Sequence, residues 1–217
     1  MFRPPVASIL VLTLASFSCN LTGAGPPAVS EAVLVDVAPA LESTPAESPA
    51  DRLNGELVSA IADYLAARDT GLARAQIFAV AETVVTESQP RGLEPWLVVA
   101  VMEVESGFDP FAVSSARAFG LMQILLPTGK ELAYRRGIPW HGTATLFDPT
   151  ENTKLGIAYL EELRDRFGDL RTALAAYNWG PGRIKRRIQR GRPLPAGYSN
   201  RVLDNYSNAF VSRHGTS

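Results

Sequence analysis

Three short segments of the sequence hold residue types that could carry out acid–base chemistry on a polar ligand. They are Glu105-Ser106-Gly107-Phe108, Gly120-Leu121-Met122-Gln123 and Ala176-Tyr177-Asn178-Trp179-Gly180. Glu105 ends an apolar stretch that begins at Pro95, so its carboxyl group is expected in apolar surroundings at the negative end of a helix dipole. Both effects favour the protonated form. A carboxylic acid that stays neutral at about pH 7 can protonate a poor leaving group.

The other polar residues of these segments allow both structural and functional interpretations. Glu103 projects to a different side of the expected helix and is interpreted as a surface or salt-bridged residue. Gln123 needs hydrogen-bond partners if it is buried, and these are either backbone groups or a ligand such as an acetamido sugar. Tyr177 and Asn178 place an aromatic ring beside an amide, a combination that can stack on a sugar and read its hydroxyl and acetamido groups.

Helical periodicity dominates the chain from about residue 53 and predicts the elements that must position these residues. A leading helix is expected over residues 53–74, with Gly71 as its breaker. Asp148-Pro149-Thr150-Glu151 is typical of a helix start, with Asp148 as the cap and Glu151 reaching back. Further helices are expected over residues 77–85, 95–105, 149–168, 169–178, 181–190 and 198–210. No alternating strand pattern is found, so the sequence predicts a mainly α-helical domain over residues 75–212.

Composition limits the other function classes. The chain has 217 residues, of which 46% are hydrophobic, enough for one domain of about 100–150 residues plus non-globular segments. The net charge of −1 gives no argument for a nucleic-acid partner. With His141, His214 and a single cysteine, the chain is not expected to bind a metal through histidine or cysteine clusters or to form an internal disulfide.

The N-terminus is typical of an exported protein. Arg3 precedes an apolar run from Val6 to Phe17, too short to span a bilayer comfortably, so residues 1–18 are interpreted as a cleaved signal. Cys19 follows in a segment similar to a bacterial lipobox, with Ser16 where an aliphatic residue is usual. We therefore expect Cys19 to be lipidated, the alternative being an ordinary signal with an incidental cysteine. The Pro-, Ala- and Ser-rich residues 19–52 would then be a disordered tether.

Taken in order, the three segments resemble the soluble lytic transglycosylase family, whose domain shares its fold with goose-type lysozyme. The resemblance covers about residues 75–210 and implies a single lysozyme-like domain with Glu105 as the sole catalytic residue. It further implies that Ser106 supports the local structure, that Ser114 contacts substrate and that Tyr198 reaches the catalytic carboxyl group. The positions matched to the sugar-binding groove are Ser106, Ser114, Gly120, Leu121, Met122, Gln123, Ala176, Tyr177, Asn178 and Tyr198. The helix that follows Asp148, with Asn152, Gly156 and Tyr159-Leu160, also matches the family pattern.

The resemblance also implies a reaction. Glu105 would protonate the glycosidic oxygen between MurNAc and GlcNAc in peptidoglycan and then take a proton from the C6 hydroxyl of MurNAc, closing a 1,6-anhydro ring without metal or cofactor. A hydrolase instead needs a second carboxylate about 5–5.5 Å or 6.5–9.5 Å from the acid. Asp109 and Asp148 are better explained as turn and cap residues. The alternatives are a lysozyme-like hydrolase, with Asp109 or another acid positioning water, and a non-catalytic peptidoglycan-binding scaffold.

Three further features have open roles at this stage. Trp179 either widens an aromatic platform or packs under the turn, and packing is favoured. His141, within Gly137-Ile138-Pro139-Trp140-His141-Gly142, is expected to be a loop residue in a groove wall. Six cations between Arg183 and Arg192 form either a solvated helix face, which is favoured, or a surface for anionic envelope components. We expect a monomer in the bacterial envelope, facing the periplasm and anchored to the outer membrane.

Overall fold

The apolar segment ahead of Glu105 forms a central helix. The computed structural model describes residues 48–214, with side chains described as far as Ala209. In this part of the chain α3 spans Pro95–Ser106, and all eight residues from Pro95 to Met102 are buried. Glu94 caps its N-terminus by accepting from the Trp96 N–H, and Gly107 ends it in the left-handed conformation. The prediction of a buried helix that begins at Pro95 is confirmed.

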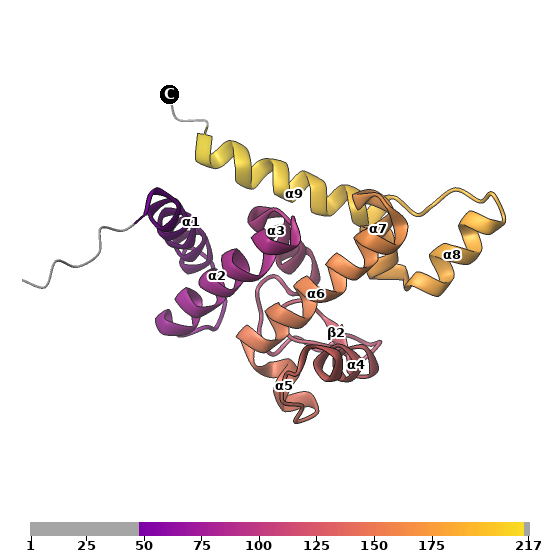
Figure 1. Ribbon diagram of the computed structural model, residues 1–217, viewed down its shortest axis with the longest axis horizontal. Coiled ribbons are helices and arrows are strands. Elements are labelled where there is room, and N and C mark those ends of the chain that lie inside the picture. Colours follow the sequence, from indigo (N-terminus) through magenta and orange to yellow (C-terminus); the bar gives the residue numbers. More distant parts are fainter. Residues whose placement is uncertain (1–47, 215–217) are drawn as a thin grey trace, which may run out of the picture. The chain divides into compact units, whose positions relative to one another are not determined.

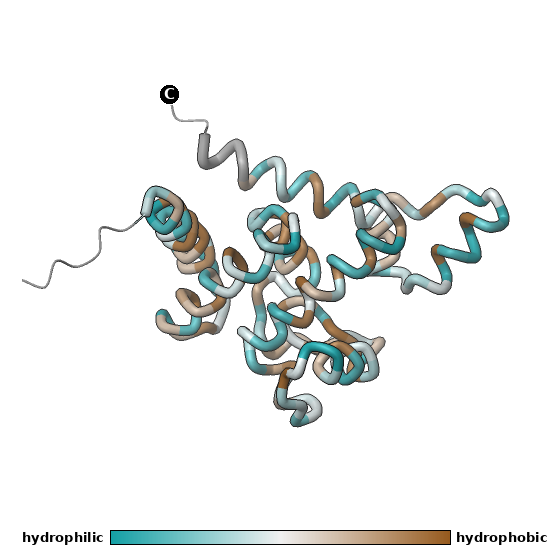
Figure 2. Tube along the Cα trace, viewed as in Figure 1, coloured by the Kyte–Doolittle hydropathy of each residue, from teal (hydrophilic) through white to brown (hydrophobic). Residues whose placement is uncertain are grey.

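The helices around α3 bury it from several sides (Figure 1). It contacts α2 and α9, while α6 contacts α2, α4, α5 and α7, so α3 and α6 organise one compact unit. The bounds are α1 Pro49–Ala66, α2 Arg74–Ser88, the 3-10 turn η1 Gln89–Arg91, α4 Leu126–Arg136, α5 Thr143–Phe147, α6 Pro149–Phe167, α7 Leu170–Trp179, α8 Pro181–Gln189 and α9 Gly197–His214. Figure 2 shows hydrophobic residues recurring along the helices that pack together, while α8 is mainly hydrophilic.

The start of α6 agrees with the sequence pattern in part. The Asp148 carboxylate accepts from the backbone N–H groups of Thr150 and Glu151, as expected for a cap. The Glu151 carboxylate does not complete a capping box and instead accepts from Lys154 Nζ at 2.9 Å. The cap therefore rests on Asp148 and on Pro149 in the first turn.

The bounds of the leading helix differ from those predicted. It begins at Pro49, where the Ser48 hydroxyl and the Asp51 carboxylate form a capping box, so the last four residues assigned to the tether are helical. It ends at Ala66, well before Gly71, which lies in a loop that leads to α2. Residues 67–73 are thus not part of a helix. The predicted signal, Cys19 and the tether up to residue 47 lie outside the described residues.

Other elements were not predicted from the sequence. β1 (Ala118–Phe119) and β2 (Ile124–Leu125) pair antiparallel, with Ala118 opposite Leu125 and Phe119 opposite Ile124. Each strand is two residues long, too short for an alternating pattern to be visible. The helices α4 and α5 follow, and α5 has only five residues. Within residues 48–214, no helix is long and apolar enough to cross a membrane.

Candidate active site

Glu105 lies in the last turn of α3, half-buried, with its carboxyl group directed to α9. The buried Tyr198 hydroxyl donates to Glu105 Oε1 at 2.6 Å. Burial raises the pKa of Glu105 from 4.5 to about 7, although the hydrogen bond from Tyr198 and the positive charge of Arg201 both act to lower it. At neutral pH a substantial share of this carboxyl group is therefore protonated, and a protonated carboxyl group can act as a general acid.

The described residues offer no obvious second carboxylate for Glu105. The carboxylate of Asp109 accepts from the Phe111 N–H at 2.8 Å, which fixes a turn, and that of Asp148 caps α6. Glu103 accepts from the Tyr64 hydroxyl at 3.2 Å and lies 3.6 Å from Arg68 Nε, as a salt-bridged residue should. Within the described part of the chain, only Tyr198 and Arg201 modify the effect of burial on Glu105.

Ser106 connects the end of α3 to the hairpin turn. Its hydroxyl lies 2.8 Å from the Leu121 carbonyl oxygen and 3.2 Å from that of Met102, and it accepts from the Phe108 N–H at 3.1 Å. The side chain thus holds the residues on both sides of the helix end. This geometry is that of a supporting residue.

The turn between β1 and β2 contains Gly120 to Gln123 and is fixed from the helices beneath it. The fully buried Asn152 side chain accepts from the Met122 N–H at 2.7 Å and donates to the carbonyl oxygens of Phe119 and Leu146, both at 2.8 Å. A Cβ at Gly120 would overlap with the Leu146 carbonyl oxygen and the Asn152 amide. Glycine is therefore required at this position, where φ is +74°.

Gln123 and Tyr177 also support this turn. Gln123 has a φ of +47°, and its Nε2 donates to the carbonyl oxygens of Ala112 and Gly120, both at 3.0 Å. The Tyr177 hydroxyl donates to the Met122 carbonyl oxygen at 2.8 Å, and only 9% of this residue is exposed. Backbone binding by Gln123 was one of the two expected outcomes. The Tyr177 ring exposes too little surface to serve as the broad stacking face that its motif indicated.

A pocket of about 250 Å³ adjoins these groups and is lined partly by Gln123, Tyr177, Asn178, Trp179 and Arg183. The exposed aromatic surface here comes from Trp179, which is 39% exposed, with the Arg183 guanidinium 5.4 Å from its ring centroid. The indole therefore remains partly on the surface beside the pocket, which favours the platform role for Trp179 over packing under the turn. A neighbouring hollow of about 410 Å³ shares Leu125, Thr128, Tyr159 and Gly180 with this pocket.

The remaining expected residues lie in three different settings. Leu121, Met122 and Ala176 are buried and pack inside the domain. The Ser114 Oγ accepts from the Ala118 N–H at 3.1 Å, in the turn before β1. His141 lies in the loop before α5, and its backbone N–H donates to Thr145 Oγ at 2.8 Å. The bracing role of Asn152 has no signal in the sequence beyond the match of the helix that follows Asp148 to the family pattern.

Comparisons with known proteins place this geometry in a family. The model of the Transglycosylase SLT domain matches residues 82–195, more than half of the chain. The transglycosylase of Enterobacteria phage PRD1 is 37% identical over 120 residues, which are 49% of this chain and 42% of that protein. The membrane-bound lytic murein transglycosylase C of Serratia proteamaculans (strain 568) is 36% identical over 124 residues, which are 52% of this chain and 34% of that protein.

Two solved structures share the fold. An inactive mutant of the lytic transglycosylase Slt from Pseudomonas aeruginosa aligns with a TM-score of 0.54 and 33% identity, over 61% of this chain and 24% of that chain. The 70 kDa soluble lytic transglycosylase of Escherichia coli aligns with a TM-score of 0.56 and 23% identity, over 79% of this chain and 32% of that one, and shows the fold alone. The chain spans less than half the length of these relatives. It belongs to the Transglycosylase SLT domain family.

Proposed function

We propose that the chain is a peptidoglycan lytic transglycosylase, which cleaves the β-1,4 bond between MurNAc and GlcNAc and leaves a 1,6-anhydroMurNAc end. The observation that carries this proposal is Glu105, a half-buried carboxyl group with a pKa of about 7 and a hydrogen bond from Tyr198. It lies in a domain whose relatives are named lytic murein transglycosylases.

The reaction needs one group to serve as acid and then as base. Protonated Glu105 donates its proton to the glycosidic oxygen, and the GlcNAc part leaves as an alcohol. The acetamido oxygen of MurNAc stabilises the positive charge at C1. The Glu105 carboxylate then takes the proton of the C6 hydroxyl while O6 bonds to C1. The cycle returns Glu105 to its acid form and consumes no water, so a second carboxylate is not needed.

The hydrogen bond from Tyr198 serves both halves of this cycle. It orients the carboxyl group and stabilises the ionised form that the first step produces, without removing the effect of burial. The turn held by Asn152, Gln123 and Tyr177 lies beside the pocket, where exposed Asn178 and Trp179 offer an amide and an aromatic face. We propose that a sugar unit of the glycan binds there.

Digestion of purified peptidoglycan in water enriched in oxygen-18 tests the reaction. Anhydro ends without label are expected, and Glu105→Gln should release none. Labelled reducing MurNAc ends would instead identify a lysozyme-like hydrolase. Binding to the cell wall with no glycan release by the wild type would identify a scaffold.

We also propose that the chain acts as a monomer in the cell envelope, tethered to the outer membrane through lipidated Cys19. The membrane-bound names of its relatives support the envelope location. Metabolic labelling with a radioactive fatty acid, in the wild type and in Cys19→Ala, tests the anchor. Label in the wild type alone is expected, and equal labelling of both forms or of neither would contradict the assignment.

A further inference from the structure

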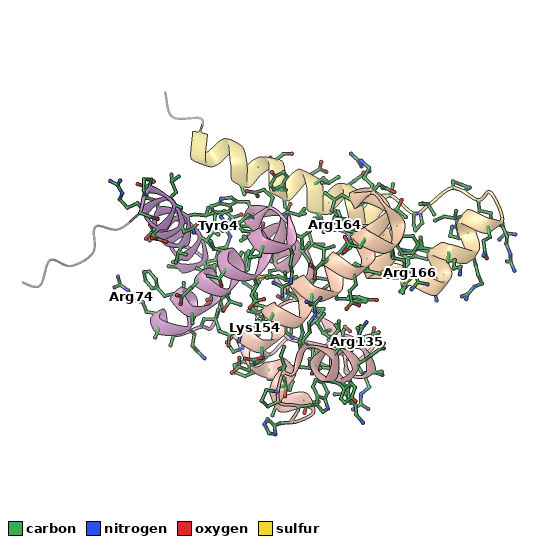
Figure 3. The ribbon with its side chains drawn as sticks, viewed as in Figure 1. Tyr64, Arg74, Arg135, Lys154, Arg164 and Arg166 are labelled. Carbon is green, nitrogen blue, oxygen red and sulfur yellow. The ribbon has the colours of Figure 1, made fainter. Side chains whose placement is uncertain are left out.

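The leading helix α1 lies outside the residues that match the family model, yet its last turn contacts the helix that carries Glu105. Its buried residues Ile61, Ala62 and Leu65 contribute to the core, which includes α2. Tyr64, close to the C-terminus of α1, projects towards α3 (Figure 3). A helix that merely preceded the domain would need no specific polar contacts at the end of α3.

Tyr64 makes three separate contacts with the α3 segment. Its ring packs edge-on against Trp96, with centroids 5.3 Å apart, and against Phe108, with centroids 6.2 Å apart. Its hydroxyl donates to Glu103 Oε2 at 3.2 Å. These contacts join α1 to both the beginning and the end of α3.

Arg68 lies over the same cluster. Its guanidinium carbon is 3.3 Å from the centroid of the Tyr64 ring and 5.7 Å from that of Phe108, while Nε lies 3.6 Å from Glu103 Oε1. Nη1 also donates to the Tyr64 carbonyl oxygen at 2.7 Å. A planar guanidinium can stack on a ring and pair with a carboxylate at the same time, which a lysine ammonium cannot do equally well. We call Tyr64, Arg68, Glu103 and Phe108 the α1 clamp.

Two residues of the α1 clamp, Glu103 and Phe108, lie on either side of Glu105 in the sequence. Gly107 and Phe108 have φ values of +60° and +70°, and the Phe108 side chain is only 2% exposed. A phenylalanine in the left-handed region is strained and persists only where surrounding contacts fix it. Here those contacts are the Tyr64 ring of α1 and the Arg68 guanidinium just beyond its end, together with the hydrogen bond from the Phe108 N–H to Ser106 Oγ.

We propose that Tyr64 and Arg68 are positioning residues that hold the last turn of α3, and thereby Glu105, in the geometry that catalysis requires. This inference rests on the proposed function for its catalytic consequence. An acid must lie within hydrogen-bond reach of its target, and a displacement of about 1 Å can cost up to about a hundredfold in rate. Ser106 joins this turn to the hairpin, and Tyr64 and Arg68 join it to the C-terminal end of α1 and the residues that follow.

The test compares Arg68→Ala and Arg68→Lys with Ile61→Val, a control variant in α1, the helix that ends two residues before Arg68. Ile61 is fully buried and makes none of the clamp contacts, so Ile61→Val reports the effect of a weaker α1 core alone. For Arg68→Ala, kcat should fall about tenfold with KM within about twofold of the wild type. Arg68→Lys keeps the charge beside Glu103 and should recover part of the loss. Ile61→Val should retain the wild-type kcat even if its Tm falls as far as that of Arg68→Ala.

Amide hydrogen exchange provides a readout that needs no substrate. The N–H of Gly107 donates to the Glu103 carbonyl oxygen at 3.1 Å and that of Phe108 donates to Ser106 Oγ, so both report on this turn. Their exchange should become about tenfold faster in Arg68→Ala and stay unchanged in Ile61→Val. Unchanged exchange and kcat in Arg68→Ala, or equal changes in Ile61→Val, would overturn the proposal. A wild type that cleaves no glycan would refute the proposed function, while the exchange rates would still decide whether α1 holds the turn.

Discussion

The two sides of the last turn of α3 carry one carboxyl group each, and the two groups have different surroundings. Glu103 faces α1, where Arg68 and the Tyr64 hydroxyl compensate its charge. Glu105 faces α9, where burial outweighs the hydrogen bond from Tyr198 and raises its pKa to about 7. Glu103 and Glu105 are separated by one residue on one helix, yet their neighbours give Glu103 the surroundings of a paired structural carboxylate and Glu105 those of the acid–base group that we propose.

The largest expected difference between the two sides is in activity. Glu105→Gln removes the transferable proton and keeps the side-chain shape, so glycan release should fall by about a thousandfold. Glu103→Gln is the matched control and should retain activity within about tenfold, because Gln still accepts from Tyr64. Release of muropeptides from purified cell walls measures both. Comparable losses in the two variants would show that the two sides do not differ in role.

The second difference concerns stability and pH. The pKa of Glu105 is raised from 4.5 to about 7, so the folded protein binds this proton more tightly than the unfolded chain. The stability contribution of protonated Glu105 is fully present below its ordinary pKa and is lost as the pH rises through about 7. Above that pH, the buried carboxylate lowers the free energy of unfolding by at most ~3 kcal/mol, and by less because solvent screens the half-buried group.

Glu105→Gln should therefore be more stable than the wild type at about pH 8.5 and nearly equal to it at about pH 4.5. Urea unfolding at the two pH values measures the difference. Glu103→Gln should show no such gain at the higher pH, because its carboxylate is paired with Arg68 in the folded protein. A Glu105→Gln variant that is less stable than the wild type at both pH values would contradict the assigned pKa.

The third prediction concerns the group on α9. Tyr198→Phe keeps the ring and removes the hydroxyl that donates to Glu105, so the pKa of Glu105 should rise and kcat should fall about tenfold through lost orientation. Tyr206→Phe, in the same helix, should leave both unchanged. The pH dependence of kcat measures the shift, and a lower midpoint in Tyr198→Phe would be inconsistent with the observed hydrogen bond.

The same two sides of α3 also show which features could be predicted from sequence. The helix itself was predictable because its signals are local, namely Pro95 at its start, an apolar run and Gly107 at its end. The partners of its carboxylates are not local. Tyr198 is 93 residues from Glu105, and only the family resemblance indicated their contact, while Tyr64 is 39 residues from Glu103 and had no sequence signal at all.

The hairpin beside the site shows a similar limit. Its strands have two residues each, and their turn is held by Asn152, about thirty residues further along the chain. A strand of two residues is too short to show the alternating hydrophobic pattern by which strands are predicted from sequence. The sequence shows that the motif contains Gly120 and Gln123, but it does not show why. The need for glycine at position 120 is steric, because Asn152 of α6 and the Leu146 carbonyl oxygen leave no room for a Cβ.

The smallest expected effect comes from Arg201 in α9, and it tests whether this residue acts on Glu105 through its charge or through its packing on Tyr198. Arg201 is exposed, and its guanidinium lies 6.0 Å from the centroid of the Tyr198 ring, from where its charge lowers the pKa of Glu105. Arg201→Gln should raise that pKa, so the pH at which activity declines should move upward, with kcat near neutral pH within about twofold of the wild type. The exposed Arg190→Gln is the matched control and should leave the pH profile unchanged.

High salt should reduce the difference between Arg201→Gln and the wild type, because it screens an exposed charge but leaves the burial of Glu105 as it is. A shift that persists in high salt would mean that Arg201 acts by packing on Tyr198, and the α9 side would then hold Glu105 by contact alone.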